Sequence, residues 1–179
     1  MTEKYFKLRT DLSIDFCGHK LFRIECIKEI VAKEINVGDL GGYVEKEDNL
    51  SGDAWVYGDA KVYGDAWVYG NAWVYGNAEV SGDAKVYGNA EVYGNAWVYG
   101  DAKVCGDKIE NRVDCVNITS QCGYNVTITP RFLKIGCQFH TKIAWWNFSD
   151  TEIEKMDGEK ALNWWKKWKP ILKAICKEQ

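Results

Sequence analysis

The sequence predicts a mainly β protein, built around a parallel β-solenoid with a β cap before it and strands and a helix after it. Nine consecutive six-residue units fill residues 52–105 without an insertion or deletion, and each reads Gly-Asp/Asn-Ala-x-Val followed in most units by Tyr. Alternation along an extended segment places the alanine and the valine of each unit on one side. A fixed short period is typical of solenoids, whose units pack against their neighbours.

Six residues a side and three sides a turn predict a triangular coil of 18 residues. Alanine and valine would point inward, because only small and medium side chains fit a narrow prism. Glycine followed by Asp or Asn suits the corners, where the backbone needs unusual φ angles or side chain–backbone hydrogen bonds. The pattern resembles the left-handed parallel β-helix of hexapeptide-repeat proteins, in which an aliphatic residue and a small residue two positions earlier face the core.

The register of the repeats continues towards the N-terminus and stops soon after the last hexad. Backwards, Asp48 falls at the alanine position and Leu50 at the valine position. Forwards, the inner positions would be taken by Lys108 and Glu110, so we expect the coil to end near Cys105. The chain therefore divides into three parts: an N-terminal cap (1–39), the solenoid (40–105), and C-terminal strands with an amphipathic helix (106–179).

The two ends have different predicted structures. Alternating segments on either side of a turn at 17–20 predict a β-hairpin, followed by a short helical or extended link, which covers the lower edge of the solenoid. After the solenoid, segments of strand composition are separated by turn signals at Gly123 and Pro130. Residues 159–177 form an amphipathic pattern with a tryptophan-rich stripe and lysines opposite it. We interpret the stripe as core rather than as a membrane or anion-binding patch.

An 18-residue period also predicts which outward side chains stack between coils. The three faces carry, in order, Trp55–Trp73–Glu91, Lys61–Glu79–Trp97 and Trp67–Lys85–Lys103, and tyrosines including Tyr75 and Tyr93 form ladders at the corners. Outward tryptophan and tyrosine are too apolar for a surface left wholly to water. Either the chain's own ends or other subunits should cover them, and a rod with three faces suits a homotrimer.

Composition argues against several classes of protein but does not identify the function. The net charge of −3 favours neither nucleic acid nor a membrane as partner. The N-terminus lacks the apolar segment of a signal peptide, and no apolar run approaches the length of a membrane span. The seven cysteines are scattered, without the paired spacing of a zinc site. We therefore expect a cytoplasmic protein with reduced thiols and no metal.

Enzymatic hypotheses find little support in the residues. Many trimers of the left-handed β-helix type are acyltransferases that use a histidine of the solenoid as base. The two histidines of this chain, His19 and His140, lie outside the repeats. Cys137 lies close to His140 in sequence, but their spacing is not diagnostic of nucleophilic catalysis. We predict no catalytic residues and no cofactor, with acyl transfer kept as an alternative.

Part of the sequence resembles a known protein family, and this resemblance suggests the kind of organism in which the protein acts. The stretch LFRIECIKEIVAKEINVGDLGGYVEKEDNLSGDAWVYGDA (21–60), with its specific GDLGGYVEKEDNLS step, resembles a hexapeptide-repeat family found in bacteriophage and prophage genomes. The likeness extends over about residues 5–105, and more loosely to the C-terminal segment. It implies a phage accessory protein that acts as an oligomer on a host target or an antiviral-defence component, and it brings no catalytic residues.

Two binding hypotheses follow, beside a purely structural role in a virion. Either a host protein docks on an aromatic and charged face of the solenoid, or the oligomer sequesters a nucleotide-type anion at subunit interfaces. For the anion, tryptophan and tyrosine would stack on a base while arginine and lysine hold phosphate. The candidate residues are Trp55, Trp67, Trp73, Trp97, Tyr75, Tyr93, Lys85, Lys103, Arg112, Arg131 and Lys134.

Overall fold

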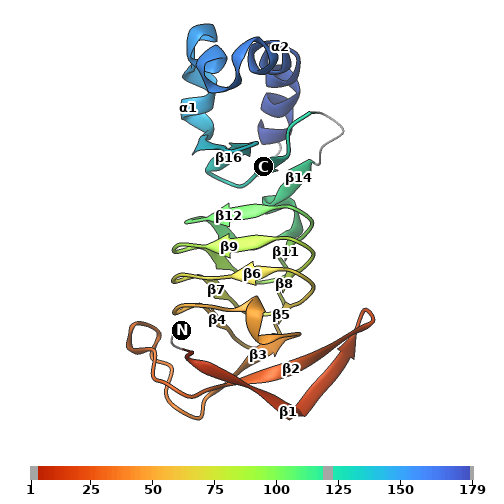
Figure 1. Ribbon diagram of the computed structural model, residues 1–179, viewed down its shortest axis with the longest axis vertical. Helices are drawn as coiled ribbons and strands as arrows, with labels where there is room; N and C mark the ends of the chain where they lie inside the picture. The colour runs from red at the N-terminus through yellow and green to blue at the C-terminus, as the bar shows by residue number, and fades with distance from the viewer. Residues whose placement is uncertain (1–3, 119–122, 178–179) are drawn as a thin grey trace.

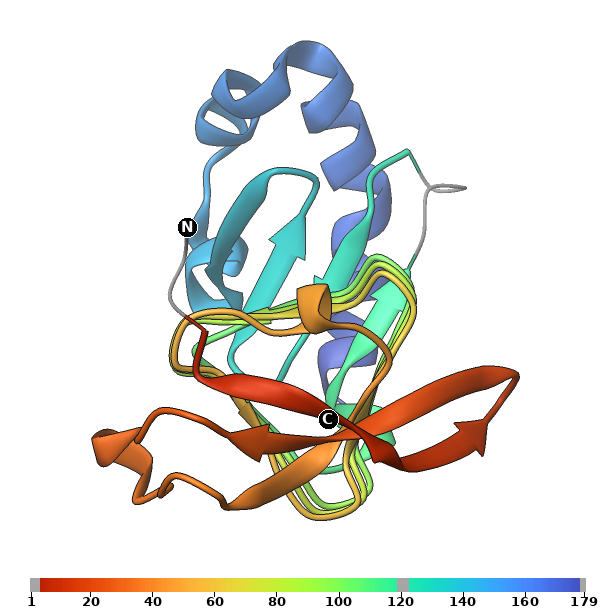
Figure 2. The same ribbon diagram turned by 60° about the horizontal axis from the view of Figure 1, so that its bottom comes forward.

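The computed structural model describes residues 4–118 and 123–177 of the chain. It has a solenoid at its centre, a long β-hairpin at one end, and a small sheet with helices at the other (Figure 1). The solenoid coils nearly superimpose when the molecule is viewed from below, and the hairpin crosses beneath them (Figure 2). The prediction of a mainly β solenoid with a C-terminal helix is confirmed.

Three parallel sheets form the faces of the solenoid. The first face contains β4 (Trp55–Val56), β7 (Trp73–Val74), β10 (Glu91–Val92) and β13 (Lys108–Ile109). The second contains β3 (Leu40–Val44), β5 (Lys61–Val62), β8 (Glu79–Val80) and β11 (Trp97–Val98). The third contains β6 (Trp67–Val68), β9 (Lys85–Tyr87) and β12 (Lys103–Cys105). Their registers confirm the predicted outward columns, including Trp55 opposite Trp73 and Lys85 opposite Lys103.

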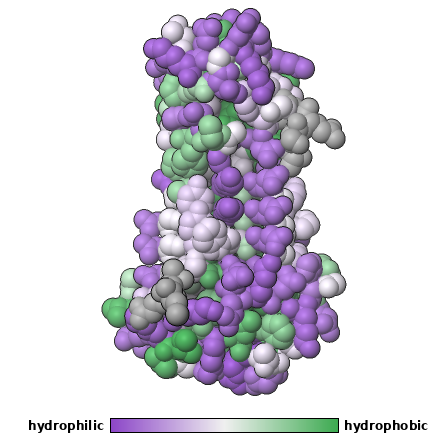
Figure 3. Space-filling view, in the orientation of Figure 1, coloured by the Kyte–Doolittle hydropathy of each residue, from purple (hydrophilic) through white to green (hydrophobic). Residues whose placement is uncertain are grey.

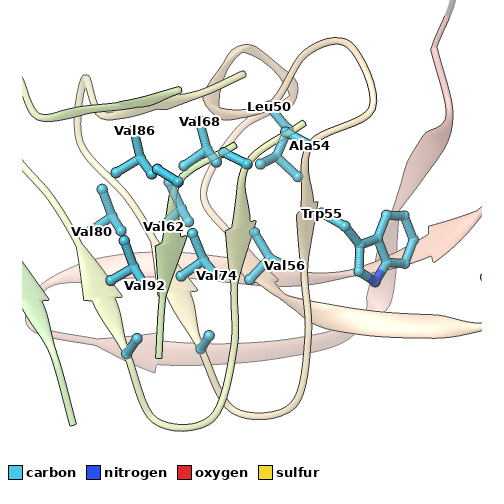
Figure 4. Packing of buried hydrophobic residues seen from close by; sticks show 14 of the residues in the cluster. Leu50, Ala54, Trp55, Val56, Val62, Val68, Val74, Val80, Val86 and Val92 are labelled. Atoms are coloured by element: carbon cyan, nitrogen blue, oxygen red, sulfur yellow. The ribbon is translucent and has the colours of Figure 1, made fainter. Parts of the chain in front are cut away.

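The interior is filled by the alanine and valine ladders, as the repeat predicts. Val56, Val74 and Val92 lie on one face with 0% exposure, and valines of the other faces meet them inside the coil (Figure 4). The corner glycines from Gly52 to Gly106 all have φ between 61° and 71°, which is the left-handed region. Any other residue would be strained at these corners, and this explains why glycine never varies in the repeat.

The lower edge differs from the prediction at one position. Asp48, expected to point inward, is exposed, and the neighbouring Asn49 is fully buried within the 3₁₀ turn η2 (Glu47–Asn49). The side-chain amide of Asn49 donates to the carbonyl oxygens of Gly64 at 3.1 Å and Ala66 at 2.8 Å. A carboxylate has no proton to donate to these carbonyls, so the amide occupies the interior position.

The upper end extends beyond the expected boundary at Cys105. Strand β13 adds a fourth level to the first face, with Lys108 opposite Glu91, so this step spans one residue fewer than the regular repeat. The shift places Asp107 and Ile109 inside, at 3% and 0% exposure, and turns Lys108 outward. Shortening the step by one residue thus allows the stack to continue without burying a lysine ammonium.

The N-terminal cap extends the sheet of the second face. Strands β1 (Phe6–Phe16) and β2 (His19–Cys26) pair antiparallel, and β2 pairs antiparallel with β3. β1 is one long strand whose register with β2 shifts between Arg9 and Ser13. The following link contains the 3₁₀ turn η1 (Val31–Lys33) and packs Ile30 and Ile35 into the same core as Trp55.

The C-terminal region is an antiparallel sheet covered by helices. Its strands are β14 (Val116–Ile118), β15 (Val126–Ile128), β16 (Phe132–Ile135) and β17 (Gln138–Thr141), after the 3₁₀ turn η3 (Arg112–Asp114). Helix α1 (Lys142–Asn147), absent from the prediction, precedes α2 (Asp150–Lys177). α2 is interrupted at Asp157 and Gly158 and continues through Pro170. Its Trp165 and Leu172 are buried, so the tryptophan stripe forms core. Neither helix of the described chain has the length and apolar character of a membrane span.

Candidate functional site

The structure distributes the predicted binding residues over several surfaces. Trp55, Trp73, Tyr75 and Tyr93 belong to the first face, Trp97 to the second, and Trp67, Lys85 and Lys103 to the third. Arg112, Arg131 and Lys134 come from the C-terminal region. Two grooves beside the solenoid bring members of this set together with residues that the sequence did not single out.

The first groove, here called the lysine groove, lies between the third face of the solenoid and the C-terminal sheet. It has a volume of about 770 Å³. Its lining consists of Asp83, Lys85, Asp101, Lys103, Gly123, Tyr124, Asn125, Thr127, Lys134 and Gly136. Three predicted residues, Lys85, Lys103 and Lys134, therefore share one cleft although Lys134 lies on a separate sheet. On the side of the molecule seen in Figure 3, hydrophilic and intermediate side chains cover the solenoid, and apolar patches appear among hydrophilic side chains above and below it.

The lysines of this groove repel one another. Lys85 and Lys103 are direct neighbours in the β9–β12 ladder. Within the described residues, neither they nor Lys134 form an ion pair. Burial, and then the charge of Lys103, lower the pKa of Lys134, whose ammonium donates to the carbonyl of Gly136 at 2.6 Å. Three cations thus face two carboxylates, of which Asp101 already accepts from the Asn125 amide at 3.3 Å.

An aromatic stack borders the lysine groove on the same face. The ring centroids of Trp67 and Tyr69 lie 4.1 Å apart, and those of Tyr69 and Tyr87 lie 5.0 Å apart with nearly parallel planes. The Lys85 ammonium lies 5.6 Å from the centroid of the Trp67 ring. Burial raises the pKa of both tyrosines above its ordinary value. The 18-residue period predicted this tyrosine ladder, but not its position beside a cationic cleft.

The second groove, here called the cap groove, lies between the first face and the link that follows β2. Its volume is about 520 Å³. It is lined by Lys33, Glu34, Ile35, Asp39, Leu40, Trp55, Tyr57, Trp73, Val74 and Tyr75. Tyr75 stacks on Tyr93 at 5.1 Å and donates its hydroxyl to Glu91 at 3.3 Å. Burial, followed by the charge of Glu91, raises the pKa of Tyr75 to about 12.

Lys33 is the functional candidate that the sequence reasoning missed. Its ammonium donates to the carbonyl oxygens of Asp53 and Ala72 and lies 5.8 Å from the centroid of the Trp73 ring. Burial lowers the pKa of Lys33 to about 8. Lys33 is the last residue of the 3₁₀ turn η1, outside the repeats, so no periodicity identified it.

The remaining predicted residues have structural roles. The Arg112 guanidinium lies 4.9 Å from the centroid of the Trp97 ring, and Arg131 binds Asp107 at the top of the solenoid. Trp55 is only 2% exposed because the cap link covers it. The cap thus covers Trp55, whereas Trp67 remains 37% exposed.

Neither histidine lines the lysine groove or the cap groove. His19 contacts Glu45 through Nδ1 at 2.9 Å, and His140 packs edge-on against Trp145 and Phe148. Among residues 4–118 and 123–177, no group of three or more His, Cys, Asp or Glu side chains is placed to hold a metal ion. Asp65, which shares a corner of the repeat with Asp83 and Asp101 at the 18-residue spacing, pairs with Lys46 at 2.7 Å.

Comparison with known proteins finds a similarity in the repeat region. Residues 60–76 and 84–100 match the family model described as YdcK Beta solenoid repeat. Both matched segments lie within the solenoid, so the similarity concerns the repeat and includes neither the cap nor the C-terminal sheet that completes the lysine groove. No curated protein matches the chain.

Proposed function

We propose that this protein is a non-enzymatic binding protein whose ligand is a phosphate-bearing, nucleotide-type anion held in the lysine groove. One observation carries the proposal: Lys85 and Lys103 of the solenoid and Lys134 of the C-terminal sheet line one cleft of about 770 Å³. A cleft of this volume lies within the range of small-ligand sites. Lysine binds phosphate as a point charge, and clustered ammonium groups are stabilised by a bound anion.

The carboxylates of the groove favour a nucleotide over a simple phosphate. Lys85 and Lys103 lie on adjacent coils, which are about 5 Å apart, so one phosphate can contact both ammonium groups. Asp83 and Asp101 would repel that phosphate, but they accept hydrogen bonds from hydroxyl groups. A ribose next to the phosphate supplies such donors. The mixed lining therefore suits a ligand that carries both an anion and hydroxyls.

The aromatic stack provides a place for the base. Trp67 is exposed and lies within cation–π distance of Lys85. A single nucleotide can therefore place its phosphate at Lys85 and stack its base on the Trp67 indole. Stacking of a base on an aromatic ring contributes about 1–3 kcal/mol and tolerates any base. The identity of the base would then depend on polar groups around the Trp67–Tyr69 stack.

The setting of this activity is also part of the proposal. The resemblance of the GDLGGYVEKEDNLS step supports a phage accessory protein, present in the host cytoplasm, that removes a nucleotide signal from an antiviral defence. We propose a homotrimer as the active form, because Trp67 remains partly exposed on one face of a three-sided rod. The alternative is a host protein as the target, reached through the same aromatic and charged surface.

Calorimetric titration with mono-, di- and cyclic nucleotides, and with inorganic phosphate, tests the proposal. We expect saturable binding of at least one nucleotide and weaker binding of phosphate alone. Replacing Lys85 or Lys103 by glutamine should weaken binding about tenfold or more, because each substitution removes a charge-assisted contact. Increasing salt should weaken binding further, since exposed charges are screened.

Lys167→Gln is the matched control, because it removes the same charge from an exposed position of α2 outside the groove. This variant should bind like the wild type. Native mass spectrometry of the purified protein adds an independent readout, with a retained nucleotide as the expected result. A protein that binds none of the nucleotides and copurifies with one host protein would instead support the protein-target alternative.

A further inference from the structure

The cap groove has the composition of a second small-molecule site, separate from the lysine groove. Its volume of about 520 Å³ is that of an ordinary ligand pocket. Most of its lining is aromatic or aliphatic, with Trp73 and Tyr75 meeting edge to face at 5.7 Å. The Tyr57 ring at the same groove is 61% exposed. A flat apolar molecule would gain offset or edge contacts with these rings.

One cation lies inside this aromatic lining. The Lys33 ammonium has three N–H donors, and two of them are directed to the carbonyls of Asp53 and Ala72. Within the described residues, Lys33 forms no ion pair. The charge of Asp53 partly offsets the effect of burial on the pKa of Lys33, but Asp53 contacts the ammonium through its backbone carbonyl and not as an ion pair. Of the two carboxylates that line the groove, Asp39 accepts from the backbone N–H of Asn36 at 2.7 Å, and Glu34 is exposed to solvent. A partly buried ammonium that makes no direct ion pair favours an anionic ligand.

We propose that the cap groove binds a small aromatic carboxylate, whose ring packs on Tyr57, Trp73 and Tyr75 and whose carboxylate accepts from the third N–H of Lys33. The aromatic rings and the ammonium group come from different parts of the chain, since the rings belong to the first face and Lys33 belongs to the cap link. The site is therefore complete only when the cap is folded against the solenoid. This ligand differs in class from the nucleotide of the lysine groove.

A pair of isosteric probes isolates the role of charge. 2-Naphthoate and the neutral 2-naphthamide have the same ring and nearly the same shape, so they differ in the contact that Lys33 makes. We expect the wild-type protein to bind 2-naphthoate about tenfold more tightly, as one charge-assisted hydrogen bond allows. Equal affinities for the two probes, or no saturable binding of either at millimolar concentration, would overturn the proposal.

Two variants separate the charge from the ring contacts. Lys33→Met retains the length of the side chain and should remove the preference for naphthoate. The Ala72 carbonyl still accepts from the backbone N–H of Trp55 at 3.1 Å, so the fold should persist, as the thermal midpoint will verify. Tyr57→Ala changes an exposed ring and should weaken both probes to the same extent. A Lys33→Met protein that folds and keeps the preference would disprove the role of Lys33.

Fluorine NMR of protein labelled with 5-fluorotryptophan locates the bound probe. The chain has nine tryptophans, and the resonances of Trp73 and Trp97 are assigned by their phenylalanine variants. Naphthoate should shift the Trp73 resonance, because this ring lines the groove. Trp97 provides the matched control, since it is also an outward solenoid tryptophan but lies on the second face. A shift confined to Trp97 would place the ligand elsewhere and contradict the proposal.

Discussion

Replacing Val74 by aspartate is expected to unfold the solenoid. Val74 is 0% exposed and lies in the middle of a ladder between Val56 and Val92. A carboxylate there would replace a methyl-bearing side chain within the core formed by the alanine and valine ladders. Burying an unpaired charge or an unsatisfied carboxyl group should lower the free energy of unfolding by about 4 kcal/mol or more. Urea denaturation followed by circular dichroism measures this change.

Val31→Asp makes the same chemical change at a site that is 76% exposed. Its stability should differ from the wild type by less than about 0.5 kcal/mol, as for most surface substitutions. If Val74→Asp were as stable as Val31→Asp, the valines would not form the core, and the assignment of inward and outward positions would be wrong.

Replacing Asp107 by asparagine is expected to weaken the junction between the solenoid and the C-terminal sheet. The carboxylate of Asp107, 3% exposed, accepts from the Thr129 hydroxyl at 2.7 Å and from the backbone N–H and side-chain Nε of Arg131 at 2.9 and 3.1 Å. In the asparagine variant, an amide NH₂ group would replace one acceptor oxygen and would face the N–H or O–H donors of Arg131 and Thr129. We expect the free energy of unfolding to fall by about 2–4 kcal/mol, measured by urea denaturation.

The same carboxylate predicts an acid sensitivity. Burial alone would raise the pKa of Asp107, but the hydrogen bonds from Arg131 and Thr129 outweigh it and hold the pKa below its ordinary value. The stabilisation is therefore present above the unfolded pKa of about 4 and is lost as pH falls through the lower folded pKa. The wild type should thus lose more stability than Asp107→Asn between pH 5 and the acid limit of denaturation.

Asp65→Asn is the matched control for both measurements. Asp65 is exposed, and it pairs with Lys46 across a solvated corner. Such surface pairs contribute about 1 kcal/mol or less. If Asp107→Asn and Asp65→Asn had equal small effects at neutral pH, the C-terminal sheet would not be anchored through Asp107.

The repeat alone was sufficient to predict the solenoid in detail. Alternation identified the buried alanines and valines, and the 18-residue period identified the outward columns, such as Trp67–Lys85–Lys103, that the strand registers confirm. Each hexad packs against its equivalents one coil away, so the neighbours of a residue can be read directly from the sequence. Opposite charges in register did not ensure an ion pair: the Lys61 ammonium, opposite Glu79, turns to the Asp59 carbonyl and the Phe16 ring.

At the two ends of the solenoid, the 18-residue period did not predict which residues point inward. At the lower edge, the backbone N–H of Asn49 is used within the turn η2, and the side-chain amide of Asn49 donates to the Gly64 and Ala66 carbonyls of the coil above. At the upper edge, a step shortened by one residue replaces Lys108 by Asp107 inside. Both changes satisfy polar groups that exist because the solenoid ends there, so a pattern derived from its middle cannot predict them.

The sequence by itself determined the solenoid, its core and the side chains that each face displays, because these depend on contacts at one fixed separation along the chain. The tertiary structure decided which of the displayed residues share a site. Lys134 meets Lys85 and Lys103 only because the C-terminal sheet docks on the top coil, and Lys33 meets Trp73 only because the cap link folds back on the first face. These contacts join segments without a common period, and the packing of the two ends against the solenoid brings them together.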